Sequence, residues 1–159
     1  MSKIDTIIDS VLKREGAATN DPVDGGGRTA YGISERANPD AWADGKVTAE
    51  EARQIYEQKY VRYPGFDKIQ DPHLQAQLVD FGVNSGSYIA IQELQKILHV
   101  SVDGILGPKT LEALSKVHPE EINTALVVAR LKMIGKIISR NPSQSKFALG
   151  WISRCCEFL

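Results

Sequence analysis

Several side chains suited to acid–base chemistry stand close together near the start of the chain. Glu15 follows apolar residues at helical spacing, and Asp21 and Asp24 lie in a turn-forming, glycine-rich segment. Thr29 and Tyr31 come directly after that segment. A carboxylic acid, a second carboxylate and a nearby hydroxyl are the groups with which enzymes hydrolyse glycosidic bonds. The segment therefore predicts glycoside hydrolysis.

The elements that must position these residues can be read from the flanking sequence. Ser2 with Asp5 three residues later predicts a capped helix start, and Gly16 predicts the helix end. Glu15 then lies at the C-terminal edge of this helix, where the helix dipole disfavours negative charge. That position, together with partial burial, would suit a residue that must donate a proton. Residues 28–33 are predicted to form a short strand.

The rest of the chain is patterned for helices separated by proline and glycine. Start signals for these helices stand at Thr48, Asp71, Ser87, Pro108 and Pro119. A last short helix is expected from Phe147 to Cys155. We predict six to eight helices and a small irregular β-hairpin near residues 20–34, which makes the fold all-α or mainly α.

The composition is that of an ordinary globular protein. The chain has 159 residues, of which 42% are apolar and 25% charged. No apolar run approaches the ~20 residues that a membrane span requires. The first residues mix charged with apolar side chains, which is not typical of a secretory signal. We therefore expect a cytoplasmic protein unless another factor releases it.

The charge is distributed unevenly. Residues 1–88 carry a net charge of -4 and residues 89–159 a net charge of +3. Acidic residues are absent between Ile122 and Cys156, where the basic residues include Arg130, Lys132, Lys136 and Arg140. Such a stretch favours an anionic partner such as cell-wall polymer, nucleic acid or lipid headgroups. A solvated helix face is the plain alternative.

Metal and disulfide chemistry are not indicated. The histidines His73, His99 and His118 lack metal-ligand spacing, so we predict neither a zinc site nor another cofactor. Cys155 and Cys156 are adjacent and offer no disulfide framework.

Several motifs together resemble a known family. The pairs Glu15-Gly16 and Asp21-Pro22, with residues 24–26 and 29–34, resemble the signature of glycoside hydrolase family 108, whose members are N-acetylmuramidases found largely as phage endolysins. Residues 91–111 look like the peptidoglycan-binding module that commonly follows in this family. Ala17 departs from the pattern, because the family often has a second glycine there.

The resemblance implies a lysozyme-like helical protein with two lobes, a muramidase lobe at residues 1–88 and a peptidoglycan-binding lobe at 89–159. Phage-type lysozymes space an acid, a second carboxylate and a threonine in a similar way around a β-turn. By this resemblance Glu15 is the general acid, while Asp24 and Thr29 manage the attacking water. The rival for the second carboxylate is Asp21, which otherwise folds the loop or binds substrate.

Two further residues are candidates for substrate binding. Tyr31 would stack on a sugar ring or hold Glu15 through its hydroxyl, with core packing as the alternative. Asn84 ends a predicted helix and would bind an N-acetyl group, with helix capping as the alternative.

The expected partner is bacterial peptidoglycan. We expect the protein to be a monomer and to lyse the host cell. The basic residues Arg130, Lys132, Lys136 and Arg140 would add contacts to outer-membrane lipopolysaccharide. A holin would release the protein from the host cytoplasm, as the resemblance to endolysins implies. Nucleic acid is not expected, because zinc knuckles, aromatic platforms and a clear recognition helix are missing from the sequence. The alternative function is a non-catalytic protein that binds the cell wall.

Overall fold

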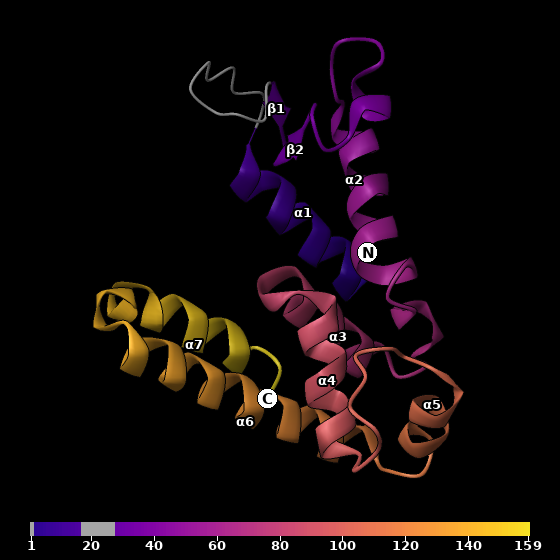
Figure 1. Cartoon of the computed structure of the whole chain (residues 1–159), viewed down its shortest axis with the longest axis vertical. Coiled ribbons are helices and arrows are strands. Elements are labelled where there is room, and N and C mark those ends of the chain that lie inside the picture. The colour runs from indigo at the N-terminus through magenta and orange to yellow at the C-terminus, as the bar shows by residue number, and fades with distance from the viewer. Residues whose placement is uncertain (1, 17–27) are drawn as a thin grey trace. The chain divides into compact units, whose positions relative to one another are not determined.

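The computed structural model describes residues 2–16 and 28–159 and confirms a mainly α fold with a small antiparallel β-hairpin (Figure 1). The chain packs as two compact units, Met1–Tyr63 and Pro64–Leu159. The elements of the first unit are α1 (Lys3–Glu15), β1 (Thr29–Ala30), β2 (Ile33–Ser34), a 3₁₀ turn (Pro39–Trp42), α2 (Ala49–Glu57) and a π-helical turn (Gln58–Arg62). Those of the second are a 3₁₀ turn (Phe66–Lys68), α3 (Pro72–Ser85), α4 (Ser87–Ile97), α5 (Pro108–Leu114), α6 (Pro119–Arg140), a 3₁₀ segment (Pro142–Phe147) and α7 (Ala148–Cys156).

Reciprocal side-chain caps fix the starts of α1 and α2. The Ser2 hydroxyl accepts from the Asp5 N–H at 3.1 Å, and the Asp5 carboxylate accepts from the Ser2 N–H at 2.8 Å. Thr48 and Glu51 repeat this arrangement at α2. Each cap satisfies backbone donors that a helix start leaves unpaired. Both caps confirm the sequence prediction.

A small apolar core joins α1, the hairpin and α2. Arg53 of α2 also forms ion pairs with Asp5 and Asp9 of α1. The indole N–H of Trp42 donates to the carbonyl of Ile33 at 3.2 Å, which ties the 3₁₀ turn to the hairpin. The buried members of this core are Ile8, Leu12, Ala30, Ile33, Trp42, Val47 and Ala52. The apolar face of α1 therefore holds the hairpin beside the end of the helix.

The second unit is built around α3. This helix is buried on almost every face from Leu74 to Gly82 and packs against α4 and α6. Its start is capped by Asp71, whose carboxylate accepts from the Leu74 N–H at 2.8 Å. The start of α4 differs from the prediction, because the N-cap is Gly86 and Ser87 is already helical.

Two ion pairs on one buried carboxylate attach α6 and α7 to α3. Asp80 of α3, 2% exposed, accepts from Arg130 of α6 at 2.5 Å and from Arg154 of α7 at 2.7 Å. Charges removed from water need such pairing and hydrogen bonding. Figure 1 shows α6 and α7, orange and yellow, running side by side. Asp80 thus fixes the geometry of three helices.

Candidate active site

Glu15 is the last residue of α1, as predicted. Gly16 follows with a φ of 71°, a left-handed conformation that favours glycine, and its N–H donates to the Leu12 carbonyl at 3.0 Å. Glu15 is exposed, and its carboxylate lies close to the backbone of Gly32. An exposed carboxylate at a helix end is accessible to a polymeric substrate.

The hairpin turn is hydrogen-bonded to the end of α1. Thr29 pairs with Ser34 and Ala30 with Ile33, which leaves Tyr31 and Gly32 as a two-residue turn. Both have a positive φ, 52° and 74°, the combination that matches the twist of a hairpin. The Tyr31 N–H donates to the Gly16 carbonyl at 3.0 Å. The turn is therefore fixed next to Glu15.

Gly32 forms a contact surface for two functional groups. A β-carbon at this position would lie 3.1 Å from Oε2 of Glu15 and 2.8 Å from the hydroxyl of Tyr56. The backbone of Gly32 thus lies against both the carboxylate and the phenol. Only a residue without a side chain fits there without displacing one of these groups.

Tyr56 of α2 completes this arrangement and was not among the predicted site residues. Its hydroxyl donates to the Tyr31 carbonyl at 2.8 Å, and its ring stacks on Tyr60 with centroids 5.8 Å apart. Partial burial, followed by the negative charge of Glu15, raises the pKa of Tyr56 to about 12. Tyr56 therefore stays protonated and able to donate at neutral pH. In sequence it appears only as one of several apolar positions of a helix.

The hairpin base is held by a second polar cluster. Arg28 donates from Nε and Nη2 to the two carboxylate oxygens of Glu35, at 3.0 and 2.8 Å, and from Nη1 to the Gly45 carbonyl. Hydrogen bonding from Arg28 holds the pKa of Glu35 below its usual value. The guanidinium also lies over the Trp42 ring, 5.1 Å from its centroid. These contacts hold the two strands together at the end away from the turn.

The other predicted site residues of the first unit have different outcomes. Thr29 is half-buried at the start of β1. Tyr31 is partly buried against the apolar core, which agrees with the packing alternative, and its backbone is what joins the hairpin to α1. Asp21 and Asp24 lie outside the described residues.

Asn84 and Arg130 belong to the second unit. Asn84 donates from its amide nitrogen to the Asp80 carbonyl at 2.8 Å and to the Asp80 carboxylate at 3.2 Å, both within its own helix, whose C-cap is Gly86. Arg130 was expected on a cationic surface, but it is 4% exposed and paired with Asp80. The prediction of a surface position is wrong because Arg130 forms a buried ion pair with Asp80 of α3. Lys132, Lys136 and Arg140 are exposed on α6.

The loop after α4 is organised by one buried amide. Gln95, 1% exposed, accepts from the N–H groups of Asp103 and Gly104 at 3.0 and 2.9 Å. Its amide nitrogen donates to the Asp103 carboxylate and to Thr110. Hydrogen bonds from Gln95 and the Ile105 N–H hold the pKa of Asp103 below its usual value. Within residues 91–111, which resemble a peptidoglycan-binding module in sequence, the loop that follows α4 is therefore folded around Gln95.

Among the described residues, no group of three or more histidine, cysteine or acidic side chains is arranged to hold a metal ion. The helices of the described ranges include none long and apolar enough to cross a membrane. Cys155 is buried and Cys156 exposed, and both are free thiols. Burial raises the pKa of the Cys155 thiol.

Comparison with known proteins matches both parts of the chain. The family model for glycosyl hydrolase 108 matches residues 8–86, and a model described as a predicted peptidoglycan domain matches residues 89–156. A solved structure of SagA from Brucella abortus is similar, with 30% sequence identity, a TM-score of 0.70, and coverage of 98% of this chain and 90% of that chain. A search of curated proteins finds no match. The chain belongs to the glycosyl hydrolase 108 family and is a peptidoglycan-degrading glycosidase with a peptidoglycan-binding domain.

Proposed function

We propose that the protein is an N-acetylmuramidase that hydrolyses the β-1,4 bond between N-acetylmuramic acid and N-acetylglucosamine in peptidoglycan. The observation that carries this proposal is the position of Glu15, an exposed carboxylate held against the turn of a hairpin. Glu15 protonates the leaving glycosidic oxygen. Bound glycan would cover this carboxylate and exclude water from the reacting bond.

Asp24 is proposed as the base that activates the attacking water, with Thr29 orienting that water. Asp24 stands four residues before Arg28 in the sequence and so belongs to the chain leading into the hairpin. Attack by water with Asp24 as base gives inversion at the anomeric carbon, for which the two carboxyl groups would be roughly 6.5–9.5 Å apart. Asp21 is the alternative base.

The first test replaces Glu15 by Gln and measures reducing-end release from purified peptidoglycan. We expect a loss of about 100-fold or more, since the proton donor is removed, with an unchanged thermal transition because Glu15 is exposed. The matched control is Glu50→Gln, an exposed glutamate of α2. Substantial activity in folded Glu15→Gln would overturn the assignment.

The products define the reaction. Mass spectrometry of the digest should place the new reducing end on muramic acid, and NMR of the fresh product should show the inverted anomer. A reducing end on glucosamine would contradict the muramidase assignment. Comparing Asp24→Asn with Asp21→Asn identifies the second carboxylate, because the less active variant lacks the base. A purely wall-binding protein would release no reducing ends at all.

The biological role proposed is that of a phage endolysin, an N-acetylmuramidase that lyses the host from within once a holin admits it to the wall. The pairing of a glycosidase family with a peptidoglycan domain on one chain supports this role. Production inside bacteria should leave cells intact until the membrane is permeabilised. If the cells fail to lyse after the membrane is permeabilised, the endolysin role is contradicted.

The exposed basic residues of α6 are proposed to approach anionic outer-membrane lipopolysaccharide. Lys132, Lys136 and Arg140 carry this charge, without the buried Arg130. Replacing the three by Gln should weaken binding to whole cells more than hydrolysis of a soluble glycan fragment. Equal losses in the two assays would refute the separate role.

A further inference from the structure

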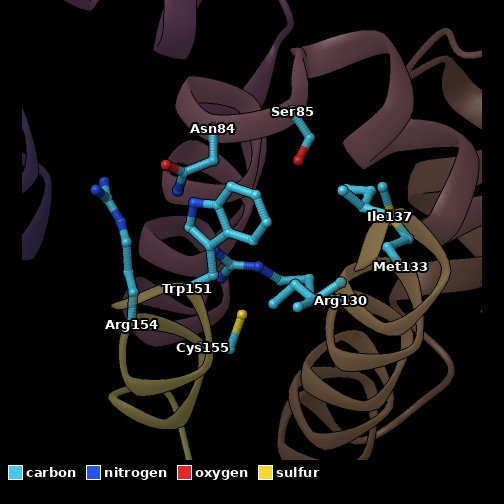
Figure 2. A pocket seen from close by; sticks show the side chains of 9 residues that line it. Asn84, Ser85, Arg130, Met133, Ile137, Trp151, Arg154 and Cys155 are labelled. Atoms are coloured by element: carbon cyan, nitrogen blue, oxygen red, sulfur yellow. The ribbon is translucent and has the colours of Figure 1, made fainter. Parts of the chain in front are cut away.

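A cavity of about 150 Å³ lies within the second unit, between the end of α3 and the helices α6 and α7 (Figure 2). Its apolar part comes from Met133, Ile134 and Ile137 of α6 and from Trp151 of α7. Its polar part includes Asn84, Ser85, Arg130 and Arg154. Figure 2 shows Arg130 running from α6 toward α7, with its guanidinium ending among the other lining side chains.

The charges around this cavity do not balance. Arg130 and Arg154 share a single carboxylate, that of Asp80, and each of its two oxygens already accepts from one arginine. The lining within the described part of the chain has no acidic side chain. One positive charge therefore remains without a counter-charge beside a cavity with apolar walls, where electrostatic attraction is stronger than in water.

One hydrogen-bond donor at the cavity is also unsatisfied. Nη1 of Arg130 is fully buried and has no acceptor among the described residues. Buried polar groups are normally hydrogen-bonded, so this orphan N–H leaves the charge of Arg130 less well compensated than that of a fully paired guanidinium. The rings of Phe81 and Phe158 lie 5.2 and 5.6 Å from the guanidinium carbon and restrict where an acceptor can approach.

We propose that this cavity binds the carboxylate end of a peptidoglycan stem peptide. The carboxylate would supply the counter-charge that Arg130 and Arg154 lack, and the small side chain of a terminal alanine would occupy the apolar space beside Trp151. The cavity volume of about 150 Å³ suits a small group of this kind. The inference rests on the proposed function, because it assumes that this unit meets peptidoglycan.

The probe for this site is N-acetyl-D-alanyl-D-alanine, compared with its C-terminal amide, in calorimetric titrations of the full chain. We expect the acid to bind at least ten times more tightly than the amide. The indole N–H resonance of Trp151 should shift with the acid. Equal affinity for acid and amide, or no binding of either, would overturn the proposal.

A charge placed at the cavity supplies a variant that keeps the fold. Ile137 lines the cavity and is 43% exposed, so Ile137→Glu should fold and should weaken binding of the dipeptide about tenfold by repulsion. The matched control is Val128→Glu, because Val128 lies on the same helix, is 44% exposed and does not line the cavity. Equal weakening by both variants would show that the effect is general electrostatics and would overturn the site.

Hydrolysis separates this inference from the proposed function. Ile137→Glu should cleave peptide-free glycan strands at the wild-type rate and bind intact peptidoglycan more weakly. Absence of cleavage by the wild type on both substrates would refute the muramidase. If Ile137→Glu cleaves glycan strands normally and also binds intact peptidoglycan as tightly as the wild type does, only the proposed peptide site is refuted.

Discussion

The carboxylate of Glu15 and the hydroxyl of Tyr56 lie against the same backbone position, Gly32. A β-carbon there would stand 3.1 Å from the first group and 2.8 Å from the second. The turn, the end of α1 and the end of α2 are thereby brought into contact at one point. Glu15, the proposed acid, therefore lies beside the neutral phenol of Tyr56.

Replacing Gly32 by Ala should reduce both stability and activity. Alanine is strained at the positive φ of 74°, and its methyl group would also collide with Glu15 and Tyr56. We expect these two effects together to lower the free energy of unfolding by about 1–3 kcal/mol. Activity on peptidoglycan should fall because the methyl group displaces Glu15 or Tyr56. Urea titration and reducing-end release measure the two effects.

The control for this variant is Gly45→Ala. Gly45 has a similar φ of 84°, but among the described residues a β-carbon there would meet only Arg28 Nη1, at 3.4 Å. It should lose stability through backbone strain and keep its specific activity. A fully active Gly32→Ala protein would show that the contact with Glu15 has no role in catalysis.

Tyr56→Phe should lower activity several-fold with a modest loss of stability. The hydroxyl donates to the Tyr31 carbonyl at 2.8 Å, and a lost hydrogen bond of this kind costs about 0.5–1.5 kcal/mol. The turn would then hold Glu15 less firmly. The control Tyr60→Phe keeps the stacked ring pair and should retain its kcat, whereas identical kinetics for both variants would argue against a positioning role for the Tyr56 hydroxyl.

The raised pKa of Tyr56 predicts a loss of stability in alkali. Burial and the charge of Glu15 raise this pKa from 10.0 to about 12, so the unfolded chain releases the proton first. The contribution is complete below pH 10 and is lost as the pH rises toward 12, with a size of about 1 kcal/mol after allowance for solvent screening. Urea titrations between pH 9 and 12 should show a steeper decline for wild type than for Tyr56→Phe. Parallel declines would contradict the coupling.

Asp80→Asn should destabilise the second unit strongly. Asp80 is 2% exposed and forms ion pairs with both Arg130 and Arg154, and breaking such a buried pair costs about 3–5 kcal/mol because the partner charge stays buried. The control is Glu57→Gln, which breaks an exposed pair with Arg62 and should change stability by less than about 1 kcal/mol. Chemical denaturation measures both, and equal effects would contradict a structural role for Asp80.

Much of the fold could be predicted because its signals are local. Caps at Ser2 and Thr48 and prolines at 72, 108 and 119 mark helix starts through contacts within one turn of chain. The same holds for the position of Glu15, which depends only on where α1 ends. The start of α4 was misplaced by one residue, because glycine and serine are both acceptable helix caps.

The sequence by itself determined the mainly α fold, the position of Glu15 at a helix end and the peptidoglycan-related family motifs. Only the tertiary structure decided that Tyr56 lies beside Glu15 and that Arg130 is buried against Asp80, 50 residues away. Spacing along the chain reports contacts within a helix turn or a hairpin. It does not report which side chains meet when separate helices pack, and the neighbours of Glu15 and Arg130 are set by that packing.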